Sequence, residues 1–153
     1  MSNTYSQIYI HVVFAVQGRQ NLLQKPWRNQ VFAYISGVLT KKGQKSLIVN
    51  GVADHVHVFF QLKPNVSLSE IVRDIKNSST HYINDNKWLK SKFSWQSGYG
   101  AFSYSISQMG AVYRYVENQE IHHQKRTFKD EYLELLKKFE IEFSDQYLFK
   151  WIE

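Results

Sequence analysis

The sequence predicts an α+β protein with a ferredoxin-like, split βαβ fold: an antiparallel sheet covered by helices on one face, with further helices at the C-terminus. Two observations lead to this prediction. Apolar residues alternate or recur at helical spacing in the order strand, helix, strand, strand, helix, strand, which is the order of that fold. The 153 residues, 43% of them hydrophobic, are enough to bury one core. We therefore expect a single domain over residues 1–153.

The first two elements differ in their periodicity. Along residues 5–16, apolar side chains alternate with polar and aromatic ones such as Tyr9 and His11. This alternation indicates a half-buried strand. Pro26 then stands where a first helical turn tolerates proline, and apolar residues recur at helical spacing until Gly43.

A hairpin and a second helix follow. Residues 46–52 and 55–62 are apolar runs joined through Gly51, Ala53 and Asp54, as in an antiparallel hairpin. Ser67, followed three residues later by Glu70, has capping-box spacing and begins the second helix.

The C-terminal third supplies one more strand and two more helices. Residues 93–104 are rich in aromatic and small side chains, which suits a loop leading into a fourth strand. Ser105 is expected to begin a third helix that runs to about Gln124, and Thr127 to begin a fourth that runs through Phe139.

If helices cover one sheet face only, the opposite face is open. Side chains from the first and third strands would lie on it, namely Tyr9, His11, His55, His57 and Phe59. An open face of aromatic and imidazole rings would suit the stacking of unpaired bases.

Composition limits the chemistry and the partners. The chain has no cysteine, which excludes disulfides and thiolate ligands, and its net charge of +6 favours a polyanion such as nucleic acid. No apolar run approaches the roughly 20 residues that cross a bilayer, and no apolar leader follows Met1. We expect a soluble, cytoplasmic protein.

His55 and His57 are the strongest metal-ligand candidates. Alternation along a strand places both imidazoles on one face, where they can bind one metal ion. The competing interpretation is a strand with two half-exposed histidines, one of them paired with Asp54. A three-histidine nucleotidyl-hydrolase motif is excluded because position 59 is Phe59. We expect His57→Ala to abolish catalysis and keep the fold, because it would alter a polar face.

Tyr115 and Gln119 are four residues apart and share one flank of the predicted third helix. Tyr113 lies on the apolar stripe of that helix and is the better core candidate, whereas Tyr115 lies off it. A tyrosine nucleophile conserves the energy of a phosphodiester bond, because the phosphotyrosine ester can be attacked by another sugar hydroxyl. A divalent metal would assist by polarising the phosphate.

These motifs together resemble the IS200-like transposases of the IS200/IS605 group, which are single-tyrosine (Y1) HUH enzymes. The resemblance rests on residues 55–57, 95–102 and 115–119 and on the trailing histidine pair at 122–123. It covers nearly the whole chain.

The resemblance implies a DNA transposase that recognises hairpins at the ends of an insertion sequence and cleaves and rejoins single-stranded DNA through a 5′-phosphotyrosine. By the same likeness, His55, His57 and Gln119 would hold Mg²⁺ or Mn²⁺ and Tyr115 would attack. A homodimer is implied, in which the tyrosine helix of one subunit can complete the metal site of the other. Repeat-associated tyrosine transposases, which act on host repeats, share this site.

Arg73 and Lys76 are the preferred phosphate contacts, because they share a face of the second helix. Two other interpretations remain open. One is a non-catalytic protein that binds single-stranded nucleic acid, and the other is a metal-dependent phosphodiesterase in which water attacks.

Overall fold

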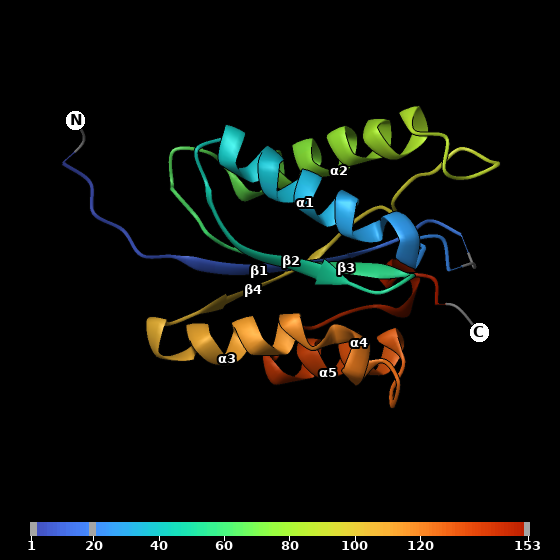
Figure 1. Ribbon diagram of the computed structural model, residues 1–153. Coiled ribbons are helices and arrows are strands. Elements are labelled where there is room, and N and C mark those ends of the chain that lie inside the picture. The colour runs from blue at the N-terminus through green and yellow to red at the C-terminus, as the bar shows by residue number, and fades with distance from the viewer. Residues whose placement is uncertain (1–2, 19–20, 152–153) are drawn as a thin grey trace.

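The structure is a computed structural model and describes residues 3–18 and 21–151. Four strands form one antiparallel sheet in the order β2-β3-β1-β4, which is the split βαβ arrangement (Figure 1). The strands are β1 (Tyr9–Ala15), β2 (Lys45–Gly51), β3 (His55–Gln61) and β4 (Gly100–Tyr104). The predicted α+β fold class is confirmed.

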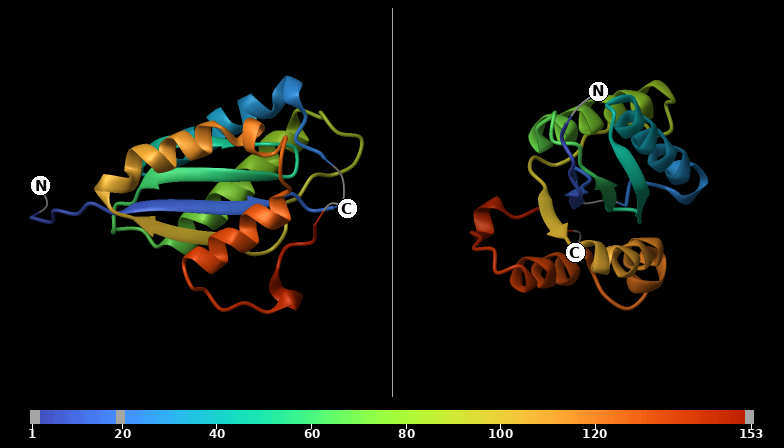
Figure 2. Two further views of the ribbon diagram at one scale, coloured as in Figure 1. Left: turned by 90° about the horizontal axis from the view of Figure 1, so that it is seen from below. Right: turned by 90° about the vertical axis from the view of Figure 1, so that its left-hand side faces the viewer.

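The helices lie in two layers, one on each face of the sheet (Figures 1 and 2). The first layer holds α1 (Lys25–Lys41) and α2 (Leu68–Asp85), and the second holds α3 (Ile106–Glu117), α4 (Gln119–His122) and α5 (Phe128–Lys138). A short 3-10 turn, Asp145–Tyr147, follows in the C-terminal segment.

The prediction of an open sheet face is therefore wrong. His11, His55, His57 and Phe59 have no exposed surface, and Tyr9 is buried as well. Phe59 packs with Val112 and Val116 of α3 in a second, smaller core on that side of the sheet. The physical reason is that α3 and α5 are amphipathic and bury their own apolar stripes against these rings.

The two central strands set the position of the histidines. On β1, Val13 lies opposite His57 and Ala15 lies opposite His55, so small side chains face each imidazole across the ladder. A tight turn after β2 leads into β3, and the Val52 amide donates to the His55 carbonyl at 3.2 Å.

Three helices begin where the sequence predicted. The Ser67 hydroxyl accepts from the Glu70 amide, the Thr127 hydroxyl accepts from the Asp130 amide, and Ser105 forms a full capping box.

The predicted single helix from Ser105 to Gln124 is instead two helices, α3 and α4, separated at Asn118. The side chain of Asn50, on β2, donates to the Val116 carbonyl at 3.0 Å and to the Glu117 carbonyl at 3.1 Å. These carbonyls would otherwise accept bonds from the next helical turn, so Asn50 ends α3 and ties it to the sheet.

Within the described residues, none of the helices is both long and apolar enough to span a membrane. That the chain forms one domain over residues 1–153 stays a prediction.

Candidate active site

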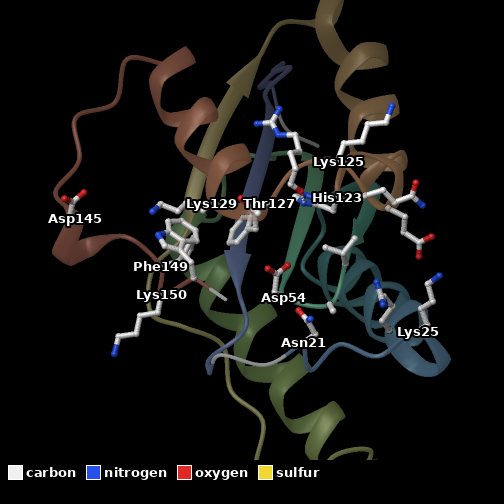
Figure 3. Close-up of a pocket in the computed structure, with 18 residues that line it drawn as sticks. Asn21, Lys25, Asp54, His123, Lys125, Thr127, Lys129, Asp145, Phe149 and Lys150 are labelled. Carbon is white, nitrogen blue, oxygen red and sulfur yellow. Dashed lines mark hydrogen bonds between the residues drawn. The ribbon is translucent and has the colours of Figure 1, made fainter. Parts of the chain in front are cut away.

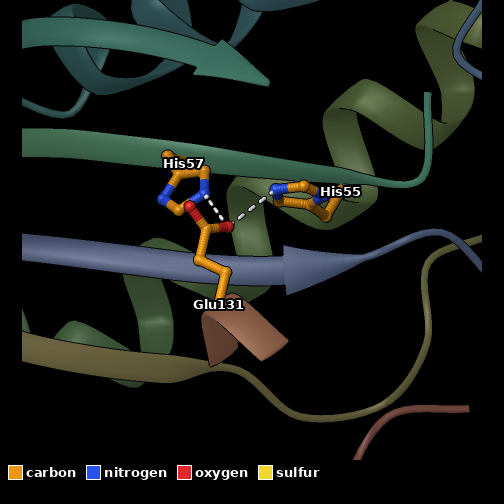
Figure 4. Close-up of side chains that lie close together, drawn as sticks. All are labelled: His55, His57 and Glu131. Atoms are coloured by element: carbon orange, nitrogen blue, oxygen red, sulfur yellow. Dashed lines mark hydrogen bonds and ion pairs between the residues drawn. The ribbon is translucent and has the colours of Figure 1, made fainter. Parts of the chain in front are cut away.

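Two imidazoles of β3 point at one carboxylate. The Nε2 atoms of His55 and His57 lie 3.2 Å and 3.1 Å from Oε1 of Glu131, which reaches up from α5 (Figure 4). The histidines have no exposed surface, and Glu131 is 2% exposed. The predicted histidine pair therefore exists, but it lies in a closed interior rather than on a polar surface.

Sequence reasoning missed Glu131. It occupies a position on the buried stripe of α5, among Phe128, Tyr132 and Leu135. A carboxylate at a core-facing position of an amphipathic helix is the signal that would have revealed it, because a buried charge needs a partner.

Tyr115 and Gln119 meet the same carboxylate. The Tyr115 hydroxyl and the Gln119 amide both donate to Oε2 of Glu131, the amide at 3.0 Å. The Gln119 carbonyl oxygen also accepts from His55 Nε2 at 3.1 Å. The break at Asn118 does not separate the two residues. The structure brings the predicted nucleophile and the three predicted metal ligands together around Glu131, namely Tyr115, His55, His57 and Gln119.

An outer set of polar residues orients this cluster. Asp54 Oδ1 lies 2.7 Å from His55 Nδ1, and His123 Nε2 lies 3.0 Å from Glu131 Oε1. His11 Nε2 and His57 Nδ1 share a hydrogen bond of 2.7 Å, and their rings are stacked. Partners on the far nitrogen of each imidazole hold Nε2 toward the centre.

The electrostatics of the cluster favour a protonated imidazole and a charged carboxylate. Burial lowers the pKa of His55, but hydrogen bonds to Asp54 and Glu131 outweigh it and raise the pKa to about 9. Burial also opposes ionisation of Glu131, yet His57 and the hydrogen bonds from neighbouring histidines hold its pKa well below the usual range.

The Tyr115 phenol is held in its neutral form. Burial and then the negative charge of Glu131 raise the pKa of Tyr115 far above its ordinary value. Both the burial of the phenol and the charge of Glu131 therefore oppose ionisation of Tyr115.

The cluster fits a divalent metal ion. One ligand atom from each of His55, His57 and Glu131 lies within 4.8 Å of the others, and Gln119 places an amide oxygen beside them. Two imidazole nitrogens with carboxylate and amide oxygens form a donor set used by divalent ions in proteins.

Two cavities flank the cluster. The larger, of about 1090 Å³, opens beside Asp54 and His123 (Figure 3). The smaller, of about 280 Å³, lies between α3 and α5 and is lined by Tyr115 and Glu131. Arg126 lines both cavities, whereas Glu131 lines only the smaller one.

The two predicted phosphate contacts lie on α2, on the opposite side of the sheet from Glu131 (Figure 1). Arg73 is exposed, with its guanidinium 3.5 Å from carboxylate oxygens of Glu70 and Asp74. Lys76 donates to the carbonyls of Gln96 and Gly98 at 2.8 Å and 2.6 Å. These two residues are not part of the cluster, and their role in DNA binding stays a prediction.

Comparison with solved structures shows the same fold. A crystal structure of a protein assigned as a transposase from Deinococcus radiodurans R1 is similar with a TM-score of 0.63 and 18% identity, over 78% of this chain and 95% of that one. A REP-associated tyrosine transposase bound to a REP hairpin is similar with a TM-score of 0.58 and 17% identity, over 80% of this chain and 74% of that one.

Sequence comparison identifies the family. No curated protein matches the chain. The family model described as "Transposase IS200 like" matches residues 4–119, which include the histidine pair, Tyr115 and Gln119. Because this match spans well over half of the molecule, the chain belongs to the IS200-like transposase family.

Proposed function

We propose that the protein cleaves and rejoins single-stranded DNA at hairpin-marked ends through a covalent bond between Tyr115 and a 5′-phosphate. The observation that carries this proposal is the carboxylate of Glu131, which binds the Tyr115 hydroxyl through one oxygen and both β3 imidazoles through the other. Nucleophile and candidate metal ligands therefore converge on one group.

In the proposed reaction, the Tyr115 oxygen attacks the scissile phosphorus, and the bond from phosphorus to the 3′-oxygen breaks. Glu131 Oε2, which already accepts the phenol hydrogen bond, is placed to take the proton. Glu131 passes this proton to the 3′-oxygen, which leaves as a hydroxyl. A later attack by another 3′-hydroxyl on the phosphotyrosine joins the strands, and the proton lost by that hydroxyl restores the Tyr115 phenol, so that no proton is gained or lost overall.

His55, His57 and Gln119, with Glu131, would hold Mg²⁺ or Mn²⁺. When bound, the ion would polarise the scissile phosphate and offset negative charge beside the phenol. The chain's own contribution is to keep the imidazoles oriented through Asp54 and His11.

The proposal also covers the DNA substrate and the oligomeric state of the protein. The structural neighbour bound to a REP hairpin supports DNA hairpins as substrates, either at element ends or at host repeats. We also propose a homodimer. The ring centroids of Tyr115 and His57 lie 5.8 Å apart within one chain, which supports a site formed by the residues of a single subunit.

The test is a covalent-adduct assay. Purified protein with Mn²⁺ is mixed with labelled single strands from both flanks of its gene and from repeats of the same genome, and a denaturing gel is run. We expect a labelled band at the mass of the protein, absent in Tyr115→Phe. Tyr113→Phe is the matched control, because it removes a phenol from the same helix without touching Glu131. Cleavage without an adduct would indicate a hydrolase, and binding without cleavage would indicate a binding module.

A further inference from the structure

The cavity of about 1090 Å³ has a strongly basic lining (Figure 3). Three carboxylates line it, from Asp54, Glu120 and Asp145. They are outnumbered by six cationic side chains, from Lys25, Arg28, Lys125, Arg126, Lys129 and Lys150. Arg126 forms an ion pair with Glu134, with Nη2 lying 2.7 Å from Oε2. The side chains of four others are exposed, namely Lys25, Lys125, Lys129 and Lys150.

Arg28, on α1, is the unusual member of this set. It is only 8% exposed, and its Nε atom has no hydrogen-bond partner in the described part of the chain. A guanidinium remains charged in proteins, and a buried charge without a full set of acceptors is unfavourable. Arg28 lines the cavity, so an anion bound there would offset its charge.

The position of the cavity connects it to the proposed chemistry. Its wall includes Asp54, which holds His55, and His123, which holds Glu131. A strand lying in the cavity would therefore pass beside residues that contact the candidate metal ligands.

The size and the remaining lining favour a polymer over a small anion. The volume of about 1090 Å³ lies at the upper limit of small-molecule sites, which span roughly 300–1,000 Å³. Aromatic side chains from α5 and the C-terminal segment, Phe128, Phe149 and Trp151, also line the cavity. Phe128 and Phe149 are buried, whereas Trp151 is half-buried and is the ring among these three that can receive a base. Cations beside an accessible aromatic ring are typical of single-strand binding sites.

We propose that this cavity binds the phosphate backbone of the DNA strand beside the scissile phosphate, with Arg28 contacting one phosphate and Lys125 and Lys129 contacting others. This inference rests on the proposed function, because it assigns the path of the same substrate.

The test measures binding without metal, so that it is independent of cleavage. Fluorescence anisotropy follows a labelled single strand of twelve thymidines in EDTA at several salt concentrations. For single strands the logarithmic salt slope changes by about 0.7 for each phosphate contact. We expect Arg28→Gln, Lys125→Gln and Lys129→Gln each to reduce the slope by about that amount.

Lys90→Gln is the matched control, since it removes an equal charge from an exposed residue outside the cavity, and its slope should equal that of the wild type. Because Arg28 is buried, Arg28→Gln could change binding by destabilising the fold. Its salt slope is therefore compared with those of Lys125→Gln and Lys129→Gln, which replace exposed side chains outside the core. Wild-type slopes in all three cavity variants would overturn the proposal.

Two further outcomes would also overturn it. Failure of the wild type to bind the probe would do so, because backbone contacts do not depend on base sequence. Displacement of the probe by millimolar thymidine monophosphate would instead identify a nucleotide pocket. The proposed function fails separately, through the absence of a Tyr115 adduct with Mn²⁺.

Discussion

The Tyr115 hydroxyl donates a hydrogen bond to the carboxylate of Glu131, although the two residues lie on different helices of the second layer. The same carboxylate contacts His55 and His57. One buried charge thus links the candidate nucleophile to the candidate metal ligands and adds to the effect of burial in raising the pKa of the phenol.

Replacing Glu131 tests this link. Glu131→Gln removes the negative charge and one ligand oxygen, and we expect the affinity for Mn²⁺ to fall at least about tenfold. Calorimetric titration of Mn²⁺ measures the change. Glu134→Gln, one turn along α5 on an exposed carboxylate, is the control. Unchanged Mn²⁺ affinity in Glu131→Gln would remove Glu131 from the metal site.

His57→Ala is expected to lose both Mn²⁺ binding and stability. The earlier expectation that the fold would be unaffected assumed a polar surface, but His57 is fully buried and is bonded to His11 and Glu131. The variant would leave a cavity and unpaired polar groups, which we expect to cost about 2–4 kcal/mol of unfolding free energy. Urea denaturation checks this, with His81→Ala on exposed α2 surface as control. Wild-type stability in His57→Ala would contradict the burial argument.

The affinity for Mn²⁺ is expected to depend on pH through His55. Its pKa is raised to about 9 in the metal-free protein, so below pH 9 most molecules must release a proton before His55 can bind a metal. Apparent affinity should therefore rise as pH increases toward 9 and level off above it. Titration of Mn²⁺ at several pH values measures the profile, and an affinity that is constant from pH 6 to 9 would be inconsistent with His55 as a ligand.

Gly51 is expected to be indispensable to the hairpin that carries the histidines. A Cβ at this position would lie 2.3 Å from the His55 carbonyl oxygen and 2.9 Å from the Val56 Cα atom, both of which belong to the backbone. We expect Gly51→Ala to lower stability by about 1–3 kcal/mol, because the strand must shift to relieve the contact. Gly37→Ala is the control, since nothing lies within 4 Å of its added Cβ. Equal melting temperatures for the two variants would disprove this.

Arg73 and Lys76 are expected to behave differently when replaced. Arg73→Gln should reduce the salt slope of single-strand binding by about 0.7, as loss of one phosphate contact does. Lys76→Gln should in addition lower stability by about 1–3 kcal/mol, because its ammonium group holds the Gln96 and Gly98 carbonyls. Anisotropy and thermal denaturation separate the effects, and an unchanged slope in both variants would exclude α2 from DNA binding.

The sequence by itself determined most of the elements and four of the five central residues of the site, His55, His57, Tyr115 and Gln119. Alternation along β3 placed His55 and His57 on one face, and the serine and threonine caps fixed where α2, α3 and α5 begin. These features depend on neighbours within a few residues, which is why periodicity and capping chemistry revealed them. The same local logic placed Tyr115 and Gln119 on one flank.

Only the tertiary structure decided how the face with the histidines is closed. An amphipathic pattern shows that a helix buries a stripe but not which surface receives it, so the position of α3 and α5 could not be predicted. Once α5 is in place, Glu131 reaches His55 and His57 from 74 residues or more away in the sequence. The break at Asn118 likewise depends on Asn50, and the carbonyl contacts of Lys76 depend on a distant loop. Long-range partners of buried polar groups are set by packing, and no local pattern encodes them.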